Sequence, residues 1–455
     1  MNTQPARGMR DFLPADVRRR EYVIGVIMEV YERYGFEPLE TPAVENIETL
    51  MGKYGEEGNQ LIFKILKRGV HEKTGEADLA LRYDLTVPLA RVVAEYKGEM
   101  PKFFKRYQIQ PVWRADRPAR GRFREFYQCD VDVLGSRSMI VEAELCAAVN
   151  DVLVKLKFRE FKIRLNHRKL LSGILTASGI PKEKHSDTLI ALDKWDKIGN
   201  EGVQQELSSR GVSEGATEKF LSIYEFAGNI SNAVDVDGAS SNDIVCGQLE
   251  DYLKGNQEGL EGLKECRKIL EFSSMTFAGD KIKVDPTVAR GLSYYTGPIM
   301  EISVRDLAGS LGGGGRYDNL VGMFSGQDVP ACGFSLGLER IILVMTERNM
   351  FPAELASAPA DVMITMWDEE SVGDSLALAN ELRHRGLRVD LYPDADKLGK
   401  QFKYAASREI PFVVVIGADE KERGEVTLKD LRTGEQRTLP REQVATAVRE
   451  GLEKP

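Results

Sequence analysis

The sequence predicts an α+β protein: a large domain built on an antiparallel sheet and interrupted by a helical insertion, followed by a small C-terminal α/β domain. Apolar and polar residues alternate over much of Leu79–Gly135, as in antiparallel strands. The stretch from about 170 to 277 has helical periodicity and no strong strand. Beyond residue 360, strand and helix patterns alternate, which is typical of a mostly parallel sheet.

The large domain is predicted from local patterns taken in chain order. Amphipathic stretches predict helices, and extended apolar stretches between turn residues predict strands. Helices are expected over 17–33, 86–96 and 139–157, an extended segment at Tyr34–Pro42, further strands at Lys281–Val284 and Ile299–Val304, and a strand leading into a helix over Ala331–Arg340.

The C-terminal domain is expected to begin after a linker that contains Pro352 and Pro359. Its solidly apolar run Phe412–Ile416 is typical of a strand covered on both faces. The expected order is strand 361–367, helix 371–386, strand 388–392, helix 397–410, strand 411–417 and a hairpin over 425–439. The predicted domains are 1–169 with 278–350, the insertion 170–277, the linker 351–360, and 361–455.

Composition and charge exclude several classes of protein. The 455 residues have a net charge of −9, which argues against general coating of nucleic acid but not against local basic surfaces. The five cysteines are scattered, which favours free thiols in a reducing compartment over disulfides or a zinc site. The start has no signal-peptide core, and no apolar run is long enough to span a membrane. We therefore expect a soluble cytoplasmic protein.

The segment Val112–Val133 has the densest set of binding residues. Alternation on its second strand is expected to place Arg122, Arg124, Phe126, Gln128, Asp130 and Asp132 on one face. An aromatic ring among arginines and carboxylates suits a planar base with phosphates. A solvated strand of alternating charge is the alternative at this point.

A second candidate site combines Ala289–Gly297 with the glycine run Gly312–Gly315. Arg290 suits a phosphate or carboxylate, and Tyr294 and Tyr295 suit a flat polar ring. The four glycines are interpreted as a close approach to a ligand, with a flexible hairpin tip as the alternative. They do not form a P-loop, because no Gly-Lys-Ser/Thr follows.

Two shorter motifs are ambiguous alone. Arg340 is expected in the first turn of a helix, where backbone N–H groups also attract anions. An exposed helical arginine is an equally good explanation. Asp84 and Thr86 precede a helix and could hold an ammonium group, although this pattern is more often a helix cap.

Together these motifs resemble class II aminoacyl-tRNA synthetases, and specifically the histidyl-tRNA synthetase family. The arginine-rich hairpin resembles motif 2, Gly333–Arg340 motif 3, and Tyr34–Pro42 with its preceding helix motif 1. Arg290–Gly297 and Gly313–Asp318 resemble two peptides peculiar to the histidine enzymes, and Arg7–Pro14 is similar to the start of the family. The resemblance covers essentially the whole chain, and it implies a class II catalytic domain and a C-terminal anticodon-binding domain.

The resemblance also implies roles for matching residues. They would activate L-histidine with ATP and pass the histidyl group to tRNA(His). The ATP would carry Mg²⁺ on its β,γ-phosphates. Motif 1 implies a homodimer. Arg114, Arg340 and Arg290 would be catalytic, and ATP would be held by Arg114, Asp116, Arg122, Phe126 and Arg340. Histidine would meet Asp84, Thr86, Gln128, Asp132, Arg290, Tyr294, Tyr295 and Tyr317, and Arg117 would meet the tRNA acceptor end.

The sequence departs from the family at two positions. Ser293 stands where the family usually has Asp, so support for Tyr295 or Arg290 would be a weaker neutral hydrogen bond. Ala119 stands where many bacterial enzymes have a Gln used at the tRNA acceptor end. Both departures concern how finely the pocket and the tRNA end are recognised.

Two alternatives stay open. One is a non-catalytic paralogue, a histidine-sensing regulatory subunit of ATP phosphoribosyltransferase; such subunits usually lack the C-terminal domain that this chain has. The other is a class II synthetase for a different amino acid, against which the Arg290–Gly297 peptide argues. In the last domain, Lys397, Lys400 and Lys403 fall on one helical face and are candidates for tRNA contact, with a solvated face as the alternative.

Overall fold

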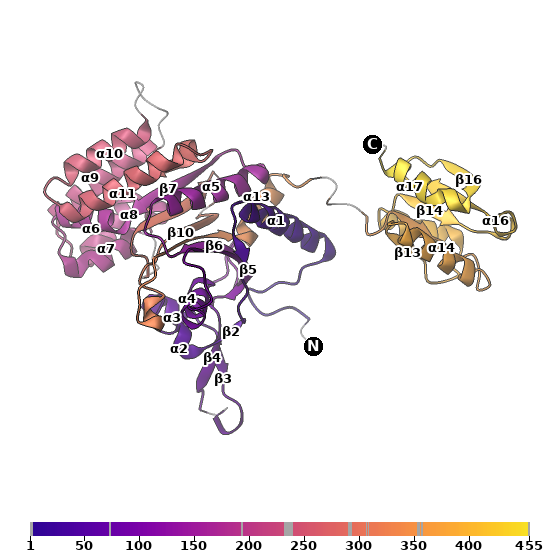
Figure 1. The fold of residues 1–455 in the computed structure, drawn as a ribbon, viewed down its shortest axis with the longest axis horizontal. Helices are drawn as coiled ribbons and strands as arrows, with labels where there is room; N and C mark the ends of the chain where they lie inside the picture. Colours follow the sequence, from indigo (N-terminus) through magenta and orange to yellow (C-terminus); the bar gives the residue numbers. More distant parts are fainter. Residues whose placement is uncertain are drawn as a thin grey trace. The chain divides into compact units, whose positions relative to one another are not determined.

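The structure is a computed structural model that describes residues 3–71, 74–192, 194–231, 240–289, 294–305, 307, 309–352, 355 and 358–453. The chain forms two compact units, residues 1–351 and 352–455 (Figure 1). Each unit has its own sheet. The predicted separation of 170–277 from the rest of the first unit stays a prediction.

An eight-stranded sheet organises the first unit, in the order β1-β5-β6-β11-β10-β9-β7-β8. All neighbours from β5 to β7 are antiparallel, whereas β1 and β8 join the two edges in parallel. The predicted antiparallel sheet is thus confirmed. The strands are β1 (Glu37–Pro38), β5 (Phe104–Trp113), β6 (Glu125–Leu134), β7 (Phe161–His167), β8 (Ile282–Val284), β9 (Pro298–Val304), β10 (Gly312–Arg316) and β11 (Ala331–Gly337).

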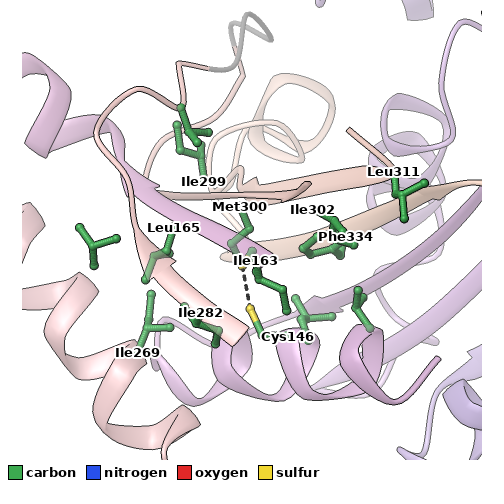
Figure 2. Packing of buried hydrophobic residues seen from close by; sticks show 14 of the residues in the cluster. Cys146, Ile163, Leu165, Ile269, Ile282, Ile299, Met300, Ile302, Leu311 and Phe334 are labelled. Carbon is green, nitrogen blue, oxygen red and sulfur yellow. Dashed lines mark hydrogen bonds between the residues drawn. The ribbon is translucent and has the colours of Figure 1, made fainter. Parts of the chain in front are cut away.

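Helices cover one face of this sheet. They are α1 (Pro14–Arg33), α5 (Ile140–Lys155) and α13 (Leu338–Glu347), and α1 packs against the other two. Cys129 and Val131 of β6 are buried in the core between sheet and helices. Figure 2 shows Cys146 of α5 directed at Met300 of β9, and the Cys146 thiol donates a 3.3 Å hydrogen bond to the Met300 sulfur. Alternate residues of these strands therefore fill the core and leave the others on the opposite face.

A smaller lobe with its own core is built between β1 and β5 and completed by a helix after β10. A three-stranded antiparallel sheet, in the order β2-β4-β3, supports it. Its elements are β2 (Val44–Asn46), α2 (Ile47–Leu50), α3 (Gly55–Gln60), β3 (Lys64–Leu66), β4 (Ala77–Leu81), α4 (Thr86–Glu95) and α12 (Gly322–Ser325).

Between β7 and β8 the described chain is helical, as predicted. The helices are α6 (Arg168–Ala177), α7 (His185–Leu192), α8 (Trp195–Ser209), α9 (Glu214–Ser231), α10 (Ser241–Tyr252) and α11 (Gln257–Ser273). His167 joins them to the sheet: its Nδ1 accepts a 3.0 Å hydrogen bond from the Lys169 N–H. The neutral ring therefore carries its proton on Nε2, which donates to Glu265 of α11 at 2.9 Å.

The second unit has a mixed five-stranded sheet in the order β13-β12-β14-β15-β16. The first three strands are parallel, and β14, β15 and β16 are antiparallel, in line with the predicted strand–helix alternation and final hairpin. Helices α16 and α17 were not predicted. The elements are β12 (Val362–Ile364), α14 (Val372–His384), β13 (Val389–Leu391), α15 (Leu398–Ser407), β14 (Phe412–Val415), α16 (Ala418–Arg423), β15 (Glu425–Asp430), β16 (Gln436–Pro440) and α17 (Val444–Leu452).

One local prediction is wrong, and one alternative is excluded. Arg122 and Arg124 precede β6 instead of lying on it, because Ala119 and Arg122 exchange backbone hydrogen bonds of 3.1 and 2.9 Å around Gly121 at φ +68°. The chain therefore turns just before the strand begins. The glycine run is not a hairpin tip, because it forms β10 inside the sheet between β9 and β11.

The described helices include none that is both long enough and apolar enough to cross a membrane.

Candidate active site

A cavity of about 1040 Å³ lies on the face of the eight-stranded sheet opposite the main core. A much smaller cavity of about 20 Å³ shares Thr86, Tyr294 and Tyr295 with it, so the two adjoin. The large cavity is lined by ten residues predicted from the sequence: Asp84, Thr86, Arg114, Asp116, Arg122, Phe126, Gln128, Tyr294, Tyr295 and Arg340. The small cavity adds Asp132 and Tyr317.

One part of the large cavity combines an aromatic ring with a cation. Arg114 directly follows β5, and Phe126 lies near the start of β6. The Arg114 guanidinium carbon is 5.1 Å from the centroid of the Phe126 ring and 4.3 Å from that of Tyr83. Its Nε also donates to the Tyr83 carbonyl at 3.1 Å. The guanidinium is therefore held above an aromatic surface, where a base and a phosphate can both be bound.

Further cations border the same part of the cavity. Arg122 Nη1 lies 3.1 Å from Asp116 Oδ2, across the turn that precedes β6. Arg340 is in the first turn of α13, as predicted, and its Nη1 donates to the Ser310 carbonyl at 2.5 Å. Because a helix N-terminus carries a partial positive charge, this part of the cavity suits a polyanion.

Asp84 provides a buried carboxylate for the other part of the cavity. Its Oδ1 accepts hydrogen bonds from the Tyr54 hydroxyl at 2.9 Å and the Val87 N–H at 3.0 Å. Its Oδ2 accepts from the Tyr294 hydroxyl at 3.2 Å. Burial raises the pKa of Asp84, while these hydrogen bonds favour its charged form. Asp84 thus caps α4 through Val87 and also lines the cavity, so the two interpretations of the sequence are compatible.

Gln128 extends this polar surface along β6. Its Nε2 donates to the Ser335 hydroxyl of β11 at 2.9 Å. Its Oε1 is buried and has no hydrogen-bond partner among the residues that the structure describes. An unpaired buried acceptor is unfavourable, so this oxygen is suited to a ligand donor.

Asp132 lies at the small cavity, two strand positions beyond Asp130. Its Oδ2 is 2.7 Å from Arg106 Nη2, and its Oδ1 accepts a short hydrogen bond from the Tyr317 hydroxyl. Burial raises the pKa of Asp132, and it raises the pKa of Tyr317 well above 10, so the phenol stays a neutral donor. The carboxylate is thereby fixed in one orientation.

The glycines of β10 leave room for this arrangement. A Cβ atom on Gly314 would lie 2.0 Å from the Gly333 carbonyl oxygen of β11, and one on Gly315 would lie 2.9 Å from the Tyr295 ring. The close approach is therefore made by the neighbouring strand and by Tyr295. Gly312 and Gly313 also line the large cavity, and their predicted approach to a ligand stays a prediction.

Two sets of predicted residues lie elsewhere, and one set is not described. Arg117 is exposed on the loop between β5 and β6 and does not line the described cavities. Arg290 and Ser293 lie outside the described residues. In the second unit, Lys397 directly precedes α15, and Lys400 and Lys403 lie within it. Lys400 Nζ is 2.6 Å from Asp396 Oδ2.

Sequence reasoning missed the residues that support the site. Arg106 lies opposite Asp132 in the β5–β6 register, and Ser335 lies opposite Asp130 in the β6–β11 register. Alternation along β5 could have placed Arg106 on the same face as Asp132. Tyr54 carries no such signal, because it reaches Asp84 from a loop 30 positions away.

Comparisons with known proteins identify the family of the chain. The family model described as "Histidyl-tRNA synthetase" matches residues 8–341, and "Anticodon binding domain" matches residues 361–451. The chain is 41% identical to a histidine–tRNA ligase of Flavobacterium johnsoniae, covering 94% of this chain and 95% of the relative. It is 42% identical to that of Porphyromonas gingivalis, covering 95% and 96%.

Among solved structures, the histidyl-tRNA synthetase of Nostoc sp. PCC 7120 matches with a TM-score of 0.79 and 31% identity, over 99% of this chain and 100% of that chain. The agreement extends over both units and includes the strands and helices that carry the cavity. The chain belongs to the histidyl-tRNA synthetase family.

Proposed function

We propose that the protein is a histidine–tRNA ligase, which converts L-histidine and ATP to histidyl-adenylate and pyrophosphate and then transfers the histidyl group to the 3′ end of tRNA(His). The observation that carries this proposal is the cavity of about 1040 Å³. It combines an arginine-rich aromatic part, near Arg114 and Phe126, with a carboxylate and amide part, near Asp84 and Gln128. Such a cavity can hold a nucleoside triphosphate beside an amino acid.

In the first step, a carboxylate oxygen of histidine attacks the α-phosphorus of ATP, and the bond from that phosphorus to the bridging oxygen breaks to release pyrophosphate. Phe126 stacks on adenine, Asp116 and Arg122 seat the nucleotide, and Arg114 with Arg340 neutralises the phosphates. Mg²⁺ enters as part of the ATP substrate, on its β,γ-phosphates. The step needs positioning and charge stabilisation and no protein nucleophile.

Histidine binds at the carboxylate and phenol part of the site. Asp84, Thr86 and Gln128 hold its α-ammonium group, for which the Asp84 carboxyl group and the unpaired Gln128 Oε1 are acceptors. Asp132 and Tyr295 meet the two imidazole nitrogens, while Tyr294 and Tyr317 close the pocket through their hydrogen bonds to Asp84 and Asp132. Arg290 bridges the histidine carboxylate and the α-phosphate; this role rests on the peptide motif alone.

The tRNA meets both units. Arg117 is exposed on the loop beside the nucleotide part of the cavity, where it can reach the acceptor end. The match of residues 361–451 to an anticodon-binding domain supports contact of the second unit with the anticodon, with Lys397, Lys400 and Lys403 as candidate contacts. We further propose that the enzyme is a cytoplasmic homodimer, because motif 1 packs at a two-fold interface in this class.

The regulatory alternative is not favoured, because the relatives above cover both units at about 41% identity and are histidine–tRNA ligases. The test is histidine-dependent exchange of pyrophosphate into ATP by the full chain. We expect exchange in the wild type and a loss of at least about a hundredfold in Arg114→Ala, which removes a charge-assisted phosphate contact.

A matched control is Arg267→Ala, which removes an arginine from an exposed ion pair with Glu250 on the helical part of the chain. It is expected to keep wild-type exchange, because exposed ion pairs contribute little to stability. Histidine binding without any exchange in the wild type would favour the regulatory alternative.

A further inference from the structure

Asp130 is a buried carboxylate in this cavity region to which the proposed reaction assigns no role. It lies on β6 between Gln128 and Asp132, on the same face as both, and is only 2% exposed. It also lines the small cavity beside Asp132. A buried carboxylate is costly unless it accepts hydrogen bonds or is paired, so its partners indicate its role.

Arg106 accounts for Asp130 only in part, because its charge is shared with Asp132. Arg106 Nη2 is 2.7 Å from Asp132 Oδ2 but 4.0 Å from Asp130 Oδ2, so its closer partner is Asp132. Gln108 of β5 lies opposite Asp130 of β6. Its Nε2 donates to Thr41 and Gln110, and its Oε1 accepts from Arg106. Asp130 therefore belongs with its remaining neighbours, Gln128 and Ser335.

These neighbours form a directed set of hydrogen bonds. Gln128 Nε2 donates to the Ser335 hydroxyl at 2.9 Å and approaches Asp130 Oδ1 at 3.5 Å. An ionised Asp130 can only accept, so Gln128 Nε2 is the donor in both contacts.

This direction fixes the Gln128 amide. Rotating the amide by 180° would turn its Oε1 toward the Asp130 carboxylate, so acceptor would meet acceptor. The observed orientation instead leaves Oε1 without a partner among the described residues, buried and able to accept from a ligand. A histidine α-ammonium group has donors and no acceptor, so it needs this orientation.

We propose that Asp130 is a positioning residue: by accepting from the Gln128 amide nitrogen, it holds this amide with its oxygen available to the α-ammonium group of histidine. This rests on the function proposed above. Asp130 thus sets selectivity for histidine over an analogue that has the same ring and carboxylate but lacks the amino group.

The test compares two ligands of the full chain by calorimetric titration: L-histidine and 3-(imidazol-4-yl)propanoate, which lacks only the amino group. Asp130→Asn introduces an amide donor that can turn the Gln128 oxygen away. We expect histidine binding to weaken about ten- to hundredfold, as for loss of a hydrogen bond to a charged group, and analogue binding to change by less than about twofold.

A second variant tests whether Asp130 acts through Gln128. Gln128→Ala is expected to weaken histidine binding by a similar factor, and the double variant to be no weaker than Gln128→Ala within about twofold, because contacts that share one path are not additive. Equal weakening of both ligands, no weakening of either, or additive effects would overturn the proposal. Wild-type pyrophosphate exchange is measured in parallel, so failure of the proposed function is recognised separately.

Discussion

Tyr317 and Asp132 act as one unit, because the neutral phenol donates to a buried carboxylate that Arg106 also contacts. We predict that Tyr317→Phe raises the KM for histidine about tenfold or more and changes kcat by less than about threefold, since one hydrogen bond to a charged group is lost from ligand positioning. Steady-state pyrophosphate exchange at varied histidine measures both constants. A loss confined to kcat would contradict this assignment.

Asp130 should also affect stability in a pH-dependent manner. Burial raises the pKa of Asp130 to about 7, above the value of an unfolded aspartate, so the folded protein binds this proton more tightly. The ionised carboxylate therefore lowers the free energy of unfolding increasingly as the pH rises from about 4 to 7, and by its full amount above pH 7.

Asp130→Asn removes this titration. We predict that its stability relative to wild type is more favourable at pH 8 than at pH 5, by about 1–3 kcal/mol. Thermal unfolding followed by calorimetry at both pH values measures the difference. The opposite trend, or a constant difference, would show that Asp130 is not destabilised by burial.

At this scale the sequence predicts the side chains of β6 that line the cavities, because alternation places Phe126, Gln128 and Asp132 on one face. It does not predict Tyr54, which reaches Asp84 through tertiary folding. Nor does it show that Asp84 caps a helix and also lines the cavity, since both uses need the same residue types.

Among the elements, β10 is the most sensitive to side-chain size. We predict that Gly314→Ala destabilises the first unit by more than about 3 kcal/mol or prevents folding, because its Cβ would lie 2.0 Å from a backbone oxygen of β11. Gly247→Ala in α10 is the control: no atom lies within 4 Å of its Cβ, and stability should rise by about 0.5–1 kcal/mol. Equal effects of the two changes on thermal unfolding would disprove the packing argument.

The junction of β7 with α6 and α11 depends on His167. We predict that His167→Ala costs about 2–4 kcal/mol, since it removes a helix cap and a buried contact at once. Hydrogen bonding by His167 lowers the pKa of Glu265 to about 2. The stabilisation that comes from this lowered pKa is present above the unfolded pKa of Glu265 and is lost as the pH falls toward 2. The stability of the His167→Ala variant should therefore fall less steeply with acid than that of the wild type.

Ser172→Ala is the matched control for this junction, because the Ser172 hydroxyl makes an exposed contact with Glu258 of α11. Its effect on unfolding should stay below about 0.5 kcal/mol, as for most surface substitutions. An equally small effect of His167→Ala would mean that the hydrogen bonds of His167 do not hold this junction together.

Sequence periodicity predicts the long elements well and their ends less well. Periodicity predicts too early a start for β6, because Arg122 and Arg124 continue its alternation, whereas the turn closed by Ala119 and Arg122 interrupts it. Periodicity does not identify β10 as a strand, because glycines have no side chains that could alternate. Its strand structure comes from pairing with β9 and β11.

For the whole molecule, the two units should separate functionally. The described lining of both cavities lies between Asp84 and Arg340, within the first unit. The second unit has its own cores, centred on Val414 and Val413. We predict that residues 352–455 alone unfold cooperatively in thermal circular dichroism, as expected of a domain with its own core.

In the same experiment, residues 1–351 should retain pyrophosphate exchange within about threefold, because the exchange does not use tRNA, while charging of tRNA(His) falls by about a hundredfold or more. Full charging by the first unit alone would show that the second unit does not contribute to tRNA binding. The alternation of strand and helix predicts this unit, whereas the sequence leaves unpredicted that α16 and α17 complete it.

The order of the large sheet also has a consequence for synthesis. The β5–β6 hairpin is complete at Leu134, but the strand that pairs with the other side of β6 begins only at Ala331. A ribosome adding about 5–20 residues per second takes about 10–40 s to cover that interval. During that time the emerging chain presents an unpaired strand edge, which is open to wrong pairing. We therefore expect this edge to be protected by factors that bind the nascent chain.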